Sequence, residues 1–173
     1  MRFFLVFVLM AFSLYASRDG GPYIGGGYGV AKLDVDGYYD LKEDSSNSTK
    51  IYAGAYINKN LSVEVEYVGD LAYEVKGRNE FTPNLMDVNT QAHYQFFNEK
   101  LDVFAKFGVG EIHYEDKGFT FVYGGGVSWW INEMFLLKFG FDRFDFGYDK
   151  DNDNSADKDF KIDYFYSAFE VQF

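Results

Sequence analysis

The sequence has 173 residues, which suits a single domain, and its aromatic content of 21% excludes a disordered chain. The chain contains no Cys, which excludes a disulfide-stapled fold and a Cys-ligated metal site, and its net charge of -11 argues against a nucleic-acid partner. Heavy aromatic content nevertheless accompanies a low mean hydropathy of -0.25.

The first 16 residues have the pattern of a secretory signal peptide. Arg2 precedes an apolar stretch from Phe3 to Tyr15, and the small residues Ala16 and Ser17 follow it. A buried N-terminal helix is disfavoured because the apolar residues occupy every helical face, and the stretch is too short to span a bilayer. We therefore expect cleavage after Ala16, one domain over residues 17–173, and a location outside the cytoplasm.

The rest of the chain is predicted to form β-strands. Apolar and polar residues alternate with period two in residues 62–67, 87–96, 101–110, 119–131 and 165–173. Two earlier strands, residues 23–35 and 49–57, are rich in Gly or weakly patterned, so their facing stays ambiguous. With a further strand that begins at Phe135, the total is eight strands.

Short and long connections alternate between these strands. Residues 57–61, 97–101 and 131–134 share a pattern of an apolar residue followed by Asn, which suits a tight hairpin turn because Asn tolerates positive φ. The intervening polar stretches are longer, and they cover residues 36–48, 69–84, 113–118 and 147–159. The pattern predicts short turns at one end of the sheet and long loops at the other.

The two faces of the strands indicate a barrel that spans a membrane. One face is an almost unbroken set of large apolar residues, while the other carries small residues such as Gly108, Gly110, Gly124 and Gly126 beside a few charges. An eight-stranded barrel has too narrow an interior for so many aromatic rings, so these rings are expected to face lipid. We predict an all-β, eight-stranded, antiparallel, up-and-down transmembrane barrel whose lumen is filled by small and polar residues.

The sequence resembles the transmembrane domain of outer membrane protein A and its small relatives from Gram-negative bacteria. Residues 62–67, 101–108, 124–128 and 166–173 carry the resemblance. It implies an outer-membrane location, contact with membrane lipid and lipopolysaccharide, and a monomer. The C-terminal pattern Phe169, Val171 and Phe173 is similar to the signal that the barrel-assembly machinery recognises.

Charged residues on the inward face form a candidate lumenal network. The resemblance matches Glu64 and Lys138 to charged residues of the family that face the lumen, and Ser128 stands where the family has a second Glu. The network predicted from the alternation comprises Glu64, Glu66, Lys106, Lys138, Asp142 and Glu170. Two interpretations stay open: ion pairs that switch to open a small pore, and a polar plug that fills the lumen, which we favour because small barrels have filled interiors.

Catalytic and metal-binding groups are few. No Ser lies within two residues of His93 or His113, so a lipid-modifying enzyme is the least favoured interpretation. An acidic loop carries Asp149, Asp151, Asp153, Asp157 and Asp159. It resembles a calcium loop but lacks the Gly at position 6 and the Glu at position 12, so a solvated surface loop is expected and no metal or cofactor is assigned.

The expected function is structural or adhesive. We expect an integral outer-membrane barrel without catalytic activity that serves envelope integrity or surface interaction. A small channel gated by lumenal charge pairs is the first alternative, and a lipid-modifying enzyme is the second. Near the outer rim, Arg143 and Lys161 are the expected partners of lipopolysaccharide phosphates.

Overall fold

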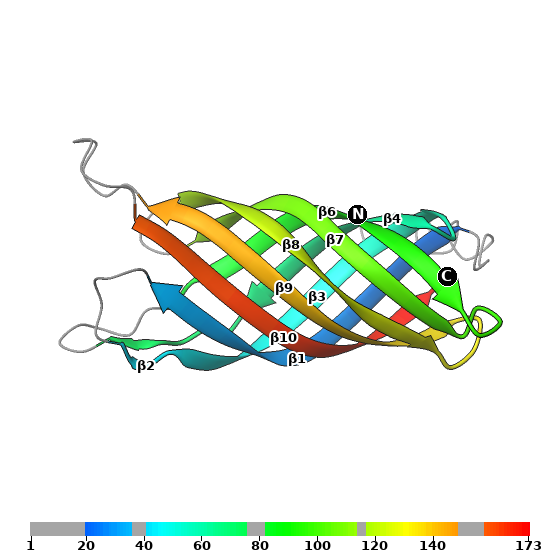
Figure 1. The fold of residues 1–173 in the computed structure, drawn as a ribbon, viewed down its shortest axis with the longest axis horizontal. Coiled ribbons are helices and arrows are strands. Elements are labelled where there is room, and N and C mark those ends of the chain that lie inside the picture. The colour runs from blue at the N-terminus through cyan, green and yellow to red at the C-terminus, as the bar shows by residue number, and fades with distance from the viewer. Residues whose placement is uncertain (1–19, 36–40, 76–81, 114–116, 149–157) are drawn as a thin grey trace, which may run out of the picture.

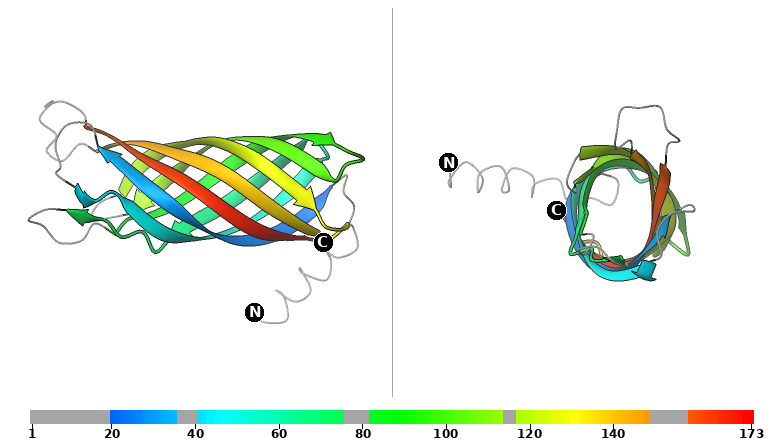
Figure 2. Two further views of the ribbon diagram at one scale, coloured as in Figure 1. Left: turned by 60° about the horizontal axis from the view of Figure 1, so that its bottom comes forward. Right: turned by 90° about the vertical axis from the view of Figure 1, so that its left-hand side faces the viewer.

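The computed structural model describes residues 20–35, 41–75, 82–113, 117–148 and 158–173. Eight long antiparallel strands close into a barrel in the order β1-β10-β9-β8-β7-β6-β4-β3, as the alternation predicted (Figures 1 and 2). These strands are β1 (Gly21–Val35), β3 (Ser45–Asn58), β4 (Leu61–Gly69), β6 (Asn84–Phe96), β7 (Leu101–His113), β8 (Lys117–Trp130), β9 (Phe135–Tyr148) and β10 (Lys158–Gln172).

The first and last strands close the barrel. β1 pairs with β10 in an unbroken antiparallel register from Tyr23 opposite Gln172 to Val35 opposite Phe160. On its other side β1 pairs with β3, so all the long strands have two neighbours. Closure leaves no free edge among these strands, which satisfies the backbone hydrogen bonds that a lipid environment cannot.

The short connections lie together at one end, which is the right-hand end in Figure 1. The three Asn residues predicted for these turns act in different ways. Asn98 adopts positive φ, together with Phe97 and Glu99 on either side. The Asn58 side chain instead accepts the Asn60 N–H, and the Asn132 side chain accepts two backbone N–H groups. One sequence pattern therefore closes hairpins by two mechanisms.

Two further short strands lie at the opposite end of the barrel. β2 (Leu41–Glu43) lies in the first long connection and β5 (Glu74–Val75) in the second, and the two strands form a separate antiparallel pair. The sequence did not predict this pair. It holds two of the long loops against each other at the base where they leave the barrel (Figure 1).

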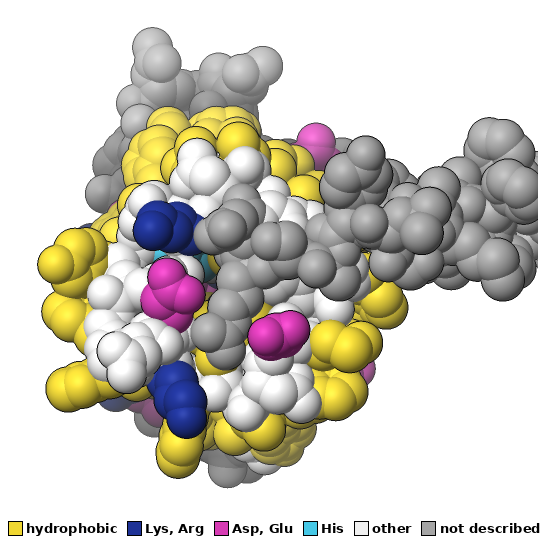
Figure 3. Space-filling view, turned by 90° about the vertical axis from the view of Figure 1, so that its right-hand side faces the viewer, with side chains coloured by type: hydrophobic (Ala, Val, Ile, Leu, Met, Phe, Trp, Pro, Cys, Tyr) yellow, Lys and Arg dark blue, Asp and Glu magenta, His cyan; other side chains and the backbone are white. Residues whose placement is uncertain are grey.

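The outward face is an apolar belt that ends at a polar rim. β7 is apolar outward from Leu101 to Val109 and then presents Glu111, while on β9 the outward series changes from Phe141 to Arg143. Exposed aromatic and aliphatic side chains cover the belt, including Phe107 at 63% and Phe139 at 51% exposure. From the short-turn end, hydrophobic side chains ring the circumference and charged or polar groups lie nearer the middle (Figure 3).

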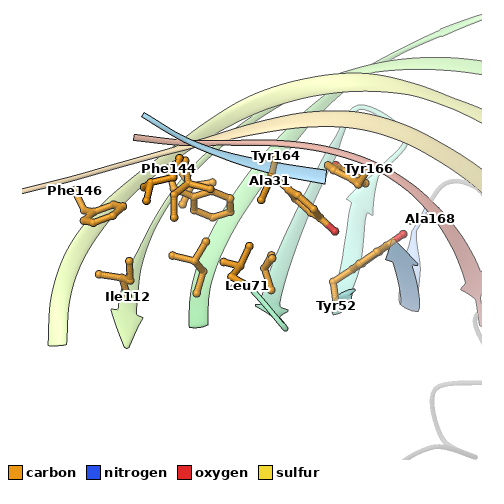
Figure 4. Packing of buried hydrophobic residues seen from close by; sticks show 14 of the residues in the cluster. Ala31, Tyr52, Leu71, Ile112, Phe144, Phe146, Tyr164, Tyr166 and Ala168 are labelled. Atoms are coloured by element: carbon orange, nitrogen blue, oxygen red, sulfur yellow. The ribbon is translucent and has the colours of Figure 1, made fainter. Parts of the chain in front are cut away.

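The lumen differs in part from the sequence prediction. Small and polar residues do line it, but so do large apolar ones, so the prediction of a lumen filled by small and polar residues holds only in part. Apolar side chains fill the half nearest the long loops, among them Leu71, Ile112, Phe144, Phe146 and Tyr164 (Figure 4). We call this cluster the outer cap. The sequence left the facing of β1 and β3 ambiguous. Their side chains that point into the lumen include Tyr23, Leu33, Lys50, Tyr52 and Tyr56.

Candidate functional site: the lumenal charge network

The charged residues predicted to face the lumen all do so. They are at most 3% exposed, and they lie on four different strands below the outer cap. The predicted members are Glu64 and Glu66 on β4, Lys106 on β7, Lys138 and Asp142 on β9, and Glu170 on β10. The barrel thus gathers charges that lie far apart in the sequence.

Two lysines and two carboxylates form an alternating ring at the centre of the network. The Lys50 Nζ lies 2.7 Å from Glu66 Oε2 and 2.9 Å from Asp142 Oδ2. The Lys106 Nζ contacts the same two oxygens at 2.6 and 2.9 Å. Each lysine therefore has two carboxylates and each carboxylate has two lysines, which is the pairing that buried charges need.

A second cluster lies beside this ring and surrounds Lys138. Its Nζ lies 3.1 Å from Glu170 Oε2 and 3.5 Å from Glu64 Oε2, and it donates to the side-chain oxygen of Gln91. Glu64 links the two clusters because its other oxygen lies 3.7 Å from Lys106. The pair Glu64 and Lys138, inferred from the family resemblance, is present.

Tyrosine hydroxyls satisfy further carboxylate oxygens. Tyr23 donates to Glu64 Oε2 and Tyr56 donates to Glu170 Oε1, each at 3.1 Å. These donors explain why part of the aromatic content lies inside the barrel: a buried Tyr fills space with its ring and supplies a hydrogen bond at its tip.

Aromatic faces also contact the lysines. The Lys50 ammonium lies 3.7 Å from the ring centroid of Tyr166, and the Lys138 ammonium lies 4.7 Å from that of Tyr52. The ring quadrupole attracts a cation at these distances. The same tyrosines are buried and pack against the charged groups.

Small residues on the neighbouring strands leave space for the lysine side chains. Lys50 lies opposite Gly27 on β1, and Lys106 lies opposite Gly124 on β8. Ser128, which stands where the resembled family has a second Glu, lies opposite Lys138. The glycines of the inward face are thus complementary in size to the long chains that cross the lumen.

Sequence reasoning missed two members of the network, Lys50 and Asp87. Lys50 lies on β3, whose weak alternation left its facing undecided, although the inward parity of Tyr52 and Tyr56 would have included it. Asp87 is 2% exposed and accepts a hydrogen bond from Asn89 at 2.7 Å. The alternation in residues 87–96 predicts the polar face for Asp87, but it does not identify the neighbours of Asp87 on the adjacent strands.

A separate hydrogen-bonded chain occupies the lumen toward the short-turn end. The Ser62 Oγ lies 2.9 Å from His93 Nε2, and His93 Nδ1 lies 2.7 Å from Asp102 Oδ2. Adjacent strands bring these groups together, so the search for a Ser near His93 in sequence was too narrow a criterion. The order of groups matches that of a Ser-His-Asp triad. However, Ser62 has no exposed surface and lies within a β-ladder that engages its backbone.

Of the predicted rim cations, Arg143 is paired with a carboxylate, and Lys161 lies opposite one in the strand register. Arg143 makes a two-pronged contact with Asp163, with its Nε and Nη2 at 2.5 and 2.6 Å from the carboxylate oxygens. Lys161 lies opposite Asp145 in the β9–β10 register. Any phosphate group that binds Arg143 therefore competes with Asp163.

The other predicted site residues are the C-terminal apolar series and the acidic loop. Phe169, Val171 and Phe173 alternate outward along the end of β10, where Phe169 stacks on Phe135 of β9. The acidic-loop residues Asp149, Asp151, Asp153 and Asp157 lie outside the described residues, and Asp159 belongs to the start of β10. In the described parts of the chain, no group of three or more His, Cys, Asp or Glu side chains could hold a metal ion.

A closed antiparallel barrel with a lipid-facing belt and a charged lumen defines an integral β-barrel membrane protein. No helix among residues 20–35, 41–75, 82–113, 117–148 and 158–173 is long and apolar enough to cross a membrane. Residues 3–173 match the family described as the outer membrane protein beta-barrel domain, and the chain belongs to this family.

Several solved outer-membrane proteins share the fold. OprG from Pseudomonas aeruginosa is 13% identical with a TM-score of 0.57, and the match covers 91% of this chain and 98% of OprG. Neisserial surface protein A is 18% identical with a TM-score of 0.55, and coverage is 89% and 99%. Ail of Yersinia pestis is 12% identical with a TM-score of 0.57 and coverage of 90% and 99%. No curated protein matches the chain in sequence.

Proposed function

We propose that the protein is a closed outer-membrane barrel that anchors and positions its long loops at the cell surface, in an envelope-stabilising or adhesive role. One observation carries the proposal: the lumen is filled along its length. The charge network occupies its centre, and the outer cap occupies the half toward the long loops. A barrel filled in this way serves as a rigid support, and its variable contacts with other molecules come from the loops.

The first test asks whether the protein resides in the outer membrane and whether its loops bind. The folded barrel should fractionate with outer membranes and migrate differently in electrophoresis before and after boiling. Exchange of residues 76–81 or 149–157 for short turns, which leaves the outer-cap residue Leu71 in place, should abolish binding to cells or surface ligands and leave the mobility shift intact. A soluble periplasmic protein without a mobility shift would overturn the proposal.

A second candidate function is a small channel, and one contact favours it. Glu64 lies within 3.7 Å of Lys106 and within 3.5 Å of Lys138, so it has two alternative cation partners. A shift of Glu64 between them would rearrange the lumen. Conductance across planar bilayers that changes on Glu64→Gln would support the channel, and the absence of conductance from the folded protein would exclude it.

Lipid contacts and assembly complete the proposal. The polar rim above the belt lies at the level of lipid headgroups, where lipopolysaccharide phosphates would meet Arg143 and Lys161. At the opposite end, Phe173 and the outward residues before it would bind the barrel-assembly machinery. Substitution Phe173→Ala should reduce the amount of barrel inserted in cells and leave refolding of the purified protein into detergent unchanged. Equal loss in both settings would indicate a packing role only.

A further inference from the structure

Two acidic side chains face each other inside the barrel without enough cations to balance them. Glu66 on β4 lies directly opposite Asp87 on β6 in the register, and both side chains turn into the lumen. Their exposures are 1% and 2%. Side chains at such positions have Cβ atoms about 5 Å apart, and like charges there repel each other.

The charge count of the lumen shows the same imbalance. Apart from Asp102, which pairs with His93, the buried charges of the described residues are five carboxylates and three lysines. The carboxylates are Glu64, Glu66, Asp87, Asp142 and Glu170, and the lysines are Lys50, Lys106 and Lys138. Because an unpaired buried charge costs several kcal/mol, the excess negative charge requires neutralisation.

Asp87 is the carboxylate with the fewest partners. Among the described residues, Lys50 and Lys106 form ion pairs with Glu66 and Asp142, and Lys138 forms ion pairs with Glu64 and Glu170. Asp87 takes part in none of these pairs, and among the described residues its one side-chain hydrogen bond comes from Asn89.

Free oxygen atoms lie on both acids. Asp87 Oδ2 and Glu66 Oε1 are buried and make no hydrogen bond to the described residues. An acidic proton between two such oxygens would satisfy both atoms and remove one negative charge.

We propose that Glu66 and Asp87 share one proton in the folded barrel, so that the lumen contains a proton-binding site beside its ion pairs. A metal ion is the less suitable occupant, since the described residues hold no group of three or more ligating side chains. One negative charge then remains in excess, and the hydroxyl groups of Tyr23 and Tyr56 donate to the carboxylates of the Lys138 cluster.

The surroundings of the pair determine its response to pH. The charged and titratable side chains around Glu66 and Asp87 are Lys50 and Tyr52 on β3, Glu64 on β4, Lys106 on β7, Asp142 on β9, and Tyr164 and Tyr166 on β10. Removal of the shared proton in alkali would leave two negative charges opposite each other. The proton stabilises the folded barrel at lower pH, and this stabilisation is lost as the pH rises.

Infrared spectroscopy of the folded protein tests the proposal directly. At neutral pH the wild-type barrel should show the C=O stretching band of a protonated carboxyl in a dry environment, and Asp87→Asn should abolish it. In Asp87→Asn the new amide can donate to Glu66, so this variant should fold and its urea midpoint should no longer fall as the pH is raised. Glu111→Gln, which alters an exposed carboxylate on β7, is the matched control and should retain both the band and the pH dependence.

Three results would overturn the proposal. They are the absence of the carboxyl band from the wild-type barrel at neutral pH, the persistence of that band in Asp87→Asn, and a parallel loss of stability in Asp87→Asn and the wild type as the pH rises.

Discussion

Removal of the Lys138 ammonium should destabilise the barrel more than removal of any exposed charge. Lys138 is 1% exposed at its side chain and is the only described lysine within 4 Å of Glu170. In Lys138→Met, Glu170 keeps only the hydrogen bond from Tyr56, whereas Glu64 keeps Lys106 and Tyr23. The variant therefore leaves about one uncompensated buried charge, not two.

The expected cost follows from that count. Removal of one partner of a buried ion pair costs about 3–5 kcal/mol in the free energy of unfolding. The double variant Lys138→Met with Glu170→Gln should recover part of this loss, because it removes the charge left without a cation. Contacting residues usually show coupling energies of about 0.5–3 kcal/mol in such a cycle.

The assay is urea unfolding in detergent micelles, followed by Trp fluorescence and by electrophoretic mobility without boiling. Lys32→Met is the control because the Lys32 and Asp44 side chains are 61% and 50% exposed, and loss of such a surface pair costs about 0–1 kcal/mol. If Lys138→Met cost no more than Lys32→Met, water would reach the lumen and the description of a closed plug would be wrong.

Three further substitutions test the packing, the turns and the hydrogen-bonded chain by the same unfolding assay. Gly25→Ala should cost about 1–3 kcal/mol because the new Cβ would overlap the Tyr52 ring, and an unchanged midpoint would mean that this ring is not fixed. Glu99→Gly should stabilise the hairpin by about 1 kcal/mol, because Glu99 has a φ of 64° that Gly adopts without strain, and a loss of stability would show that its side-chain contacts matter more. Asp102→Ala should cost about 1–3 kcal/mol by leaving His93 Nδ1 without its buried partner, and a neutral result would place water there.

The barrel itself was predictable because strand facing is a local property of the sequence. The alternation in residues 87–96 assigned each side chain to a face, and the structure confirms that assignment. In β1 the alternation carries less information, because glycines occupy positions of both parities from Gly25 to Gly27. The inward facing of Tyr23 in this strand could not be recognised before its register was known.

Contacts within the lumen were less predictable because they depend on how the sheet closes. Lys50 donates to Asp142 across 92 positions of the sequence, and no local pattern encodes that approach. Ser62 and His93 are 31 residues apart and meet because β4 and β6 are neighbours. The alternation within a strand thus predicts which way a charged side chain points, but it does not identify the residue that pairs with it.

The outer cap was missed for another reason. Phe144 and Phe146 have the same parity as Asp142 and face the lumen, where both are buried. Alternation of apolar and polar residues distinguishes the lipid-facing side chains from the lumenal ones only where the lumenal side chains are polar. Above the belt the contrast reverses, because Arg143 and Asp145 point outward to the headgroup level while the phenylalanines point inward.

This reversal gives the barrel two different kinds of interior. Within the belt lipid surrounds the wall, and the lumen provides hydrogen bonds and ion pairs. Above it, water and headgroups surround the wall, and the lumen provides hydrophobic burial of the kind that stabilises soluble proteins. Both strands of the β9–β10 pair change from apolar to charged outward residues at the same level. Phe141 lies opposite Phe165, and the next outward pair toward the long loops is Arg143 opposite Asp163. The boundary between the two patterns therefore marks the edge of the apolar belt that lies nearer the long loops.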